Sequence, residues 1–248
     1  MKPQRLASPP INEALIDLRA ELAPGTAVER LAAFHAGVAS TYPESEKRVT
    51  VSGSFEVGPS GQPKIDVPPP QHVGFMCWSS DRVQAVQARL DGFTLNRLRP
   101  YTHWEQFSGE AKACWPEYVR VASPTSVVRV ALRYINRIEI PAKAEFSKYF
   151  RTLPQLAPEL PQSVANLLMR VVLGVSTGRA VVLTMASETV NPAGNSGKIP
   201  VILDIDVFQE GDFKPDDPKI WDILEELREL KNRVFFDSLT EEALEVYR

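Results

Sequence analysis

The chain has 248 residues, of which 44% are hydrophobic and 24% charged, and its formal net charge at pH 7 is −3. These proportions are close to the average for globular proteins, and they exclude an intrinsically disordered chain or a fibrous repeat. The slight excess of acidic residues argues against a protein coated in positive charge, so no sequence-specific binding to duplex DNA is expected. A local basic surface is still compatible with this total.

The N-terminal segment, MKPQRLASPPINEAL, contains no apolar run of signal-peptide length. No other stretch approaches the roughly 20 apolar residues that are needed to cross a bilayer. We therefore expect a cytoplasmic protein without membrane association. The two cysteines, Cys77 and Cys114, fall in apolar patterns, and under cytosolic redox conditions they are expected to be inert buried thiols.

The first part of the chain predicts strands interrupted by a helix and a loop. In chain order we expect a strand at 11–22, a helix of about four turns from a cap at Thr26 to Tyr42-Pro43, a strand at 49–57, a Pro- and Gly-rich loop at 58–70, and an antiparallel meander at 72–98. The turn residues Asp91-Gly92 lie before the last strand of this meander.

A second helix is expected after Thr102, because Thr102 and Glu105 have the spacing of a capping box. Its buried face is marked by apolar residues at helical spacing, namely Trp104, Phe107, Ala111, Cys114, Trp115 and Tyr118. Pro116 should kink or end this helix early, since proline lacks the N–H and clashes with the carbonyl four residues back.

The second half repeats the antiparallel theme. Strands are expected at 166–175, 179–188 and 199–208, with a loop at 191–198, a helix from Asp217-Pro218 with an inner stripe of Ile220, Ile223, Leu224, Leu227, Leu230 and Val234, and a last short helix capped by Ser238-Leu239-Thr240-Glu241. These elements predict an α+β protein built of antiparallel sheets with helices packed on one face. We expect two related β-rich subdomains, 1–141 and 162–248, joined by a connector at 142–161.

The run from Ser126 to Pro141 predicts one long strand whose two faces differ in chemistry. One face is expected to be core and carries Val128, Val130, Leu132, Tyr134, Asn136, Ile138 and Ile140. The other face carries Arg129, Arg133 and Arg137, each about 13 Å from the next at about 3.3 Å per residue. This set is the arginine stripe.

Guanidinium groups held on a sheet can bind phosphate or carboxylate in a bidentate manner. Arg97 and Arg99 would join the arginine stripe if their strand were its neighbour in the sheet. The alternative, which the sequence favours, is that the arginines lie on a solvated face or pair across strands with acids such as Asp204 and Asp206.

Asn136 interrupts the apolar face, where an unpartnered amide would cost about 1 to 3 kcal/mol. It should therefore hydrogen-bond either the buried backbone or a ligand. The three histidines lack metal-binding spacing, and two carboxylates at Asp204 and Asp206 are a weak basis for a cation site, so no metal or other cofactor is expected. No nucleophile, base and orienting group can be assembled from the sequence, so no catalytic residue is expected.

Several landmarks occur in one order: Pro9-Pro10-Ile11-Asn12-Glu13-Ala14, Leu98-Arg99-Pro100-Tyr101 followed by Trp104 and Phe107, Leu132-Arg133-Tyr134-Ile135-Asn136-Arg137-Ile138, and a closing helix leading into Val234-Phe235 and Ser238-Leu239-Thr240. This combination resembles a sporadically distributed bacterial protein family of about this length, over nearly the whole chain. The most specific element is the Arg-Tyr-Ile-Asn-Arg run. No activity is assigned to that family, so the resemblance implies no site residues, and its patchy distribution is compatible with mobile or defence-associated loci.

These observations favour a non-catalytic binding or assembly module, whose extended sheets and long C-terminal helix would serve a protein partner or self-association. The alternative is a phosphate-ligand protein, either a nucleotide or RNA binder or an enzyme acting on phosphoesters. Its ligand contacts would be Arg97, Arg99, Arg129, Arg133, Asn136 and Arg137.

Overall fold

The computed structural model describes residues 6–51, 54–57, 63–66, 68–101, 103–142, 144–161, 164, 166–187 and 197–248. The strands are β1 (Ile11–Glu21), β2 (Glu44–Thr50), β3 (Ser54–Val57), β4 (Pro63–Asp66), β5 (Gln71–Trp78), β6 (Gln84–Arg89), β7 (Gly92–Leu98), β8 (Ser126–Pro141), β9 (Leu168–Ser176), β10 (Arg179–Ser187) and β11 (Lys198–Phe213). The α-helices are α1 (Phe34–Val38), α2 (Trp104–Ala122), α3 (Lys219–Ser238) and α4 (Glu241–Glu245), and the 3₁₀ helices are η1 (Val28–Ala33) and η2 (Phe146–Lys148).

Nine of the strands form one antiparallel sheet in the order β2-β5-β6-β7-β1-β8-β11-β10-β9, while β3 and β4 pair separately. The long strand β8 is central, because it pairs with β1 on one side and with β11 on the other. The α+β class with antiparallel strands is thus confirmed. One sheet runs through both halves of the chain, and the structure does not confirm two subdomains.

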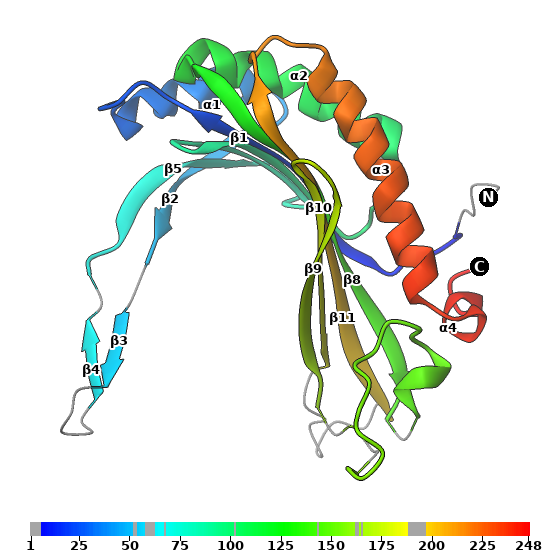
Figure 1. Ribbon diagram of the computed structural model, residues 1–248. Coiled ribbons are helices and arrows are strands. Elements are labelled where there is room, and N and C mark those ends of the chain that lie inside the picture. The colour runs from blue at the N-terminus through cyan, green and yellow to red at the C-terminus, as the bar shows by residue number, and fades with distance from the viewer. Residues whose placement is uncertain are drawn as a thin grey trace.

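The sheet bends into an arch, and helices α2 and α3 lie on its outer, convex side (Figure 1). Helix α3 packs on β8 and β11, and α2 packs on β6 and β7. No helix in the described part of the chain lies on the concave side of this arch. None of the helices described is both long and apolar enough to span a bilayer.

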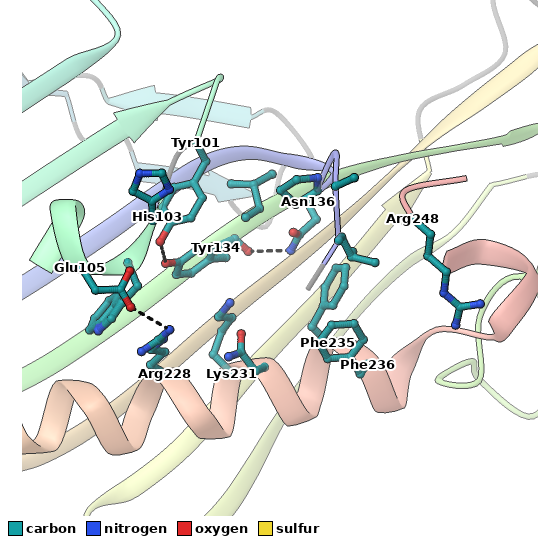
Figure 2. Close-up of a pocket in the computed structure, with 16 residues that line it drawn as sticks. Tyr101, His103, Glu105, Tyr134, Asn136, Arg228, Lys231, Phe235, Phe236 and Arg248 are labelled. Atoms are coloured by element: carbon teal, nitrogen blue, oxygen red, sulfur yellow. Dashed lines mark hydrogen bonds and ion pairs between the residues drawn. The ribbon is translucent and has the colours of Figure 1, made fainter. Parts of the chain in front are cut away.

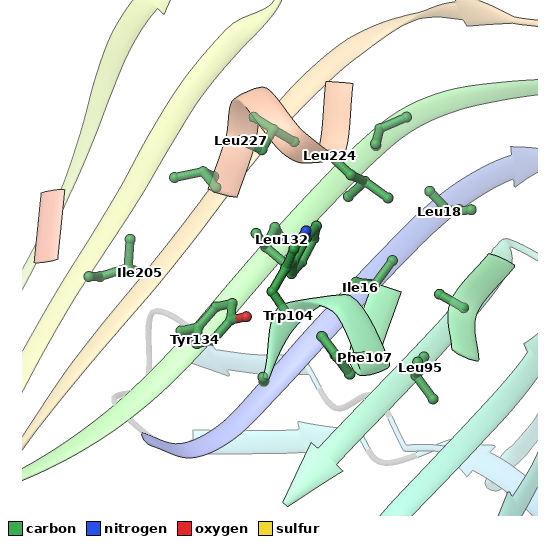
Figure 3. Close-up of a cluster of buried hydrophobic side chains, with 14 of the residues drawn as sticks. Ile16, Leu18, Leu95, Trp104, Phe107, Leu132, Tyr134, Ile205, Leu224 and Leu227 are labelled. Carbon is green, nitrogen blue, oxygen red and sulfur yellow. The ribbon is translucent and has the colours of Figure 1, made fainter. Parts of the chain in front are cut away.

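The hydrophobic core fills the space between the convex face and these helices (Figure 3). Ile16 of β1, Leu132 of β8 and Leu227 of α3 meet there and have no exposed surface. The alternation predicted for β8 holds from Leu132 onward, while Ala131 on the concave face is buried like its neighbours Val130 and Leu132. At its start Val127 is buried and Val128 is half-buried, the reverse of the prediction, because the register with β1 shifts between Arg19 and Ala20.

Helix α2 buries the predicted face, but Pro116 neither ends nor interrupts it, and the helix continues to Ala122. Pro116 is exposed, so the carbonyl of Lys112, which loses its helical donor, faces water rather than the core. The expected capping box involves Thr102, which lies outside the described residues. Thr240 does cap α4, accepting a hydrogen bond from the backbone N–H of Ala243 as predicted.

Two other predictions on the N-terminal side are corrected. The helix expected from Thr26 is a 3₁₀ turn followed by the short α1, and the Thr26 hydroxyl donates to the carbonyl of Ala23 instead of capping it. The strand expected at 49–57 is divided between β2 and β3, and β4 lies within the predicted loop. Alternation could not reveal β2, since Glu-Ser-Glu-Lys-Arg-Val-Thr forms a sheet edge that is exposed on both faces.

Two glycines provide a matched test of this packing. Gly92 has a φ of +140°, and a Cβ there would lie 2.1 Å from the carbonyl oxygen of Leu18, whereas a Cβ on Gly109 in α2 would meet nothing within 4 Å. We expect Gly92→Ala to lower the free energy of unfolding by more than about 1 kcal/mol. Gly109→Ala should raise it by about 0.5 to 1 kcal/mol, because alanine favours an exposed helix interior. Urea unfolding of both variants would show this, and equal effects would contradict the close approach at Gly92.

Candidate functional site

The arginine stripe lies on the concave face and is paired with acids. Arg133 forms a bidentate ion pair with Asp204, with its Nε 2.8 Å from Oδ1 and its Nη2 2.5 Å from Oδ2. Arg129 donates to Asp206 at 2.8 Å. The pairing with Asp204 and Asp206 that the sequence favoured is therefore observed, and Arg137 donates to Glu139 at 2.7 Å.

Arg97 and Arg99 do not join the arginine stripe, because β1 separates β7 from β8. Arg97 lies opposite Ala14 and therefore on the convex face, where it donates to the side-chain oxygen of Gln84 at 3.0 Å. Arg99 is exposed beyond the end of β7. The residues predicted as ligand contacts are thus spread over both faces of the sheet.

Asp17 connects the concave ion pairs across three strands. Its carboxylate accepts hydrogen bonds from Arg89 at 2.8 Å and from Arg19 at 2.9 Å, and it lies 3.4 Å from Arg129. Burial alone would raise the pKa of Asp17, but the guanidinium groups of Arg89 and Arg19 outweigh it and the pKa is lowered. The centre of the concave face is therefore internally neutralised.

A pocket of about 1030 Å³ lies on the convex side, between α3, the start of α2 and the convex faces of β1 and β8. We call it the Lys231 pocket (Figure 2). It is lined by Leu6, Ala7, Pro9, Ile11, Tyr101, His103, Trp104, Glu105, Tyr134, Asn136, Arg228, Lys231, Asn232, Phe235, Phe236 and Arg248. Residues from both ends of the chain thus meet at one site.

Lys231 points from α3 toward β8, and its Nζ lies 3.8 Å from the centre of the Tyr134 ring. The residue is 9% exposed, and among the described residues it has no carboxylate partner. Burial, with the nearby charge of Arg228, lowers the pKa of Lys231 to about 7. An amine with this pKa is divided between its charged and neutral forms near neutral pH.

Polar groups of β8 and of the segment after β7 complete the floor. The hydroxyls of Tyr101 and Tyr134 are hydrogen-bonded at 2.8 Å, and burial raises the pKa of both phenols. The Asn136 amide donates to the carbonyls of Leu203 at 3.0 Å and Tyr134 at 3.3 Å. The backbone partners expected for Asn136 are thus present, and the residue also faces the pocket.

The pocket has more positive than negative charge. Its lining carries Lys231, Arg228 and Arg248, against the carboxylate of Glu105, although Arg248 also pairs with Glu241 and Glu245 outside the lining. Arg228 lies 3.5 Å from Glu105 and 3.4 Å from Glu225, distances too long for strong hydrogen bonds. Aromatic side chains, including Trp104, Phe235 and Phe236, form the apolar part of the wall. The geometry therefore offers a cationic end and an apolar body.

Sequence reasoning found Asn136 but missed Lys231 and Tyr101. A signal for Lys231 was present, because it lies four residues after Leu227 and so falls on the inner stripe of α3, where a charged side chain is unusual. Within the described residues no group of three or more His, Cys, Asp and Glu is placed to hold a metal ion. Both cysteines are buried and unpaired, and burial, with Glu110 adding to it, raises the pKa of Cys114 to about 12, which keeps that thiol protonated.

A scan against protein-family models found no match to this chain, and a search of curated proteins found no match either. The resemblance drawn from the sequence landmarks therefore stays an expectation. The function has to be argued from the site.

The pKa of Lys231 predicts how stability depends on pH. Because the folded-state pKa of about 7 is below the ordinary value of 10.5, the unfolded chain binds an additional proton between these values. The penalty for burying Lys231 is full below pH 7 and decreases as the pH rises. We expect the free energy of unfolding of the wild type, relative to Lys231→Met, to rise from pH 7 to 9 by at most about 1.4 kcal/mol per pH unit. Urea unfolding would measure this difference, and a pH-independent difference would contradict it.

Proposed function

We propose that this chain is a non-catalytic binding module whose Lys231 pocket holds a small organic anion, best a carboxylate attached to an apolar body. The observation that carries this proposal is that the buried ammonium group of Lys231 lines a pocket and has no carboxylate partner among the described residues. A cytoplasmic location and membership of the resembled bacterial family belong to the same proposal.

The free-energy cost of an unpaired buried cation supports an anionic ligand. An unpaired buried charge is costly, and a bound carboxylate would supply the missing partner for Lys231. Arg228 lies one helical turn before Lys231 and has only long contacts to acids, so it can approach the same anion. The aromatic wall would take the apolar body of the ligand, as in most small-molecule sites.

The same groups argue against a catalytic role. The raised pKa values of Tyr101 and Tyr134 keep both phenols protonated, so they act as hydrogen-bonding groups rather than bases. No serine or cysteine is among the described residues that line the pocket, and Lys231 contacts an aromatic ring rather than a base that would activate it.

The test is a binding screen against Lys231→Met. Phenylacetate, 3-phenylpropionate and octanoate would be titrated by thermal shift and calorimetry, beside the corresponding neutral amides. We expect carboxylates to bind, and we expect Lys231→Met to weaken them by about 10- to 100-fold, since a charge-assisted hydrogen bond contributes about 1.5 to 3 kcal/mol.

Lys219→Met is the matched control, because Lys219 is exposed at the start of the same helix and lies outside the pocket lining. It should bind like the wild type. Amides binding as tightly as the acids, or Lys231→Met binding them unchanged, would refute an anion-binding pocket.

Self-association is a second candidate function, favoured by the edge strand β9. This strand pairs with β10 on one side and ends the sheet on the other, and Leu168, Val172, Leu173 and Val175 are large hydrophobic residues exposed along it. An apolar edge that pairs with no other described strand is suited to pairing with a strand of another chain. Two copies paired antiparallel about Val172 would set Arg170 opposite Gly174, so no like charges would meet.

A charge placed at the centre of β9 tests this second candidate. Val172→Lys should shift a dimer to monomer in sedimentation or light-scattering measurements, because two lysines would then face each other. Val49→Lys is the control, since Val49 is equally exposed, at 55% against 56%, on the opposite edge strand β2. A monomeric wild type at high protein concentration would exclude β9 as a self-association edge.

A further inference from the structure

Strand register places a second set of arginines in one row on the concave face. Pairs of directly opposed residues connect Arg48 of β2, Gly74 of β5, Arg89 of β6, Gly92 of β7 and Arg19 of β1. Each neighbouring pair of arginines is separated by one glycine. With strands about 4.8 Å apart, their backbones are about 10 Å from one another.

The glycine between Arg48 and Arg89 is required by the packing. A Cβ on Gly74 would lie 2.2 Å from the carbonyl oxygen of Ala88 and 2.8 Å from the Cα of Arg89. Gly74 therefore contributes no side chain between Arg48 and Arg89. A small pocket of about 300 Å³ lies there, lined by Arg19, Arg48, Thr50, Val73, Arg89, Leu90 and Asp91. We call it the Arg48 pocket.

The carboxylates around this pocket already form ion pairs with Arg89 and Arg19. Arg89 donates to Asp17 at 2.8 Å and to Asp91 at 2.7 Å, and Arg19 pairs with the same two acids. Asp17 also faces Arg129 at 3.4 Å. These acids therefore leave no carboxylate for Arg48.

Arg48 has no ion pair within the described part of the chain, and its side chain is half-buried. Burial, together with the positive charges of Arg89 and Arg19, lowers the pKa of Arg48, although Asp91 and Asp17 oppose this. The guanidinium groups of Arg48, Arg89 and Arg19 are thus held close together around the Arg48 pocket.

We propose that the Arg48 pocket binds a phosphate group, as inorganic phosphate or on a small phosphomonoester. Guanidinium groups match phosphate oxygens in bidentate geometry, and an anion between Arg48, Arg89 and Arg19 would relieve their mutual repulsion. This site is distinct from the Lys231 pocket, which lies on the other face of the sheet. Phosphate binding, which the sequence suggested for the arginine stripe, is thus assigned to a different set of arginines.

A small ligand fits this site better than a nucleic acid. The pocket is small, and the acids Asp17 and Asp91 beside it would repel a polyanion that extended past the bound phosphate. The net charge of −3 adds to that repulsion.

The experiment measures thermal shift and calorimetric binding of inorganic phosphate, phenyl phosphate and a short single-stranded RNA, with sodium chloride keeping the ionic strength constant. We expect saturable stabilisation of the wild type by inorganic phosphate, by phenyl phosphate, or by both, and the relative affinities identify the source of the group. Arg48→Gln should weaken binding at least 10-fold. Without phosphate it should melt at or above the wild-type temperature, because a like charge has been removed.

Lys47→Gln is the matched control: it removes one positive charge from the adjacent residue of β2, whose side chain points to the opposite face. Arg19→Gln serves as a second variant and should also weaken binding.

Equal phosphate binding by wild type and Arg48→Gln would overturn the proposal, as would a shift that chloride reproduces. Arg48-dependent binding of RNA with no response to either phosphate compound would overturn it in favour of a polyanion site. Lys231→Met should retain phosphate binding, which separates this test from that of the Lys231 pocket.

Discussion

Strand β8 is hydrogen-bonded along both edges, to β1 and to β11, over most of its 16 residues. Its side chains alternate, so Leu132 and Tyr134 enter the core while Arg129 and Arg133 meet acids on the concave face. A slip of one residue would exchange the two sets and bury the arginines. The helices, the concave ion pairs and the floor of the Lys231 pocket therefore all depend on one register.

Charged side chains are paired differently on the two faces of the sheet. On the concave face, Arg129 and Arg133 pair with Asp206 and Asp204, and Arg89 pairs with Asp17. Arg48 of β2 has no ion pair within the described part of the chain. On the convex face, Lys231 is buried against the ring of Tyr134 and has no carboxylate partner among the described residues. Burying Arg48 and Lys231 without a carboxylate partner reduces the stability of the chain in the absence of a ligand. Such energetically unfavourable groups are most often found at functional sites.

Much of this architecture follows from local sequence. Period-two alternation predicted β8 and its paired acids Asp204 and Asp206, and helical spacing predicted the buried faces of α2 and α3. The two pockets could not be predicted from local sequence, because each combines residues that only the strand order and register bring together. Arg48 and Arg89 are neighbours through Gly74. Tyr101, in the segment after β7, hydrogen-bonds Tyr134 of β8 although β1 lies between β7 and β8. An exposed edge such as β2 has no apolar face, so periodicity could not detect it.

Strand β1 precedes β7 and β8 in the chain, which begin at Gly92 and Ser126, but is placed between them in the sheet. It has no sheet partner until those later residues have left the ribosome, and the apolar row Ala14, Ile16 and Leu18 stays uncovered for that time. Pairing over such a long separation in sequence is slow, because a large loop must close before any contact is gained. Nascent chains that end before β8 should therefore bind chaperones. Truncated forms of this protein that lack β8 should aggregate rather than fold partially.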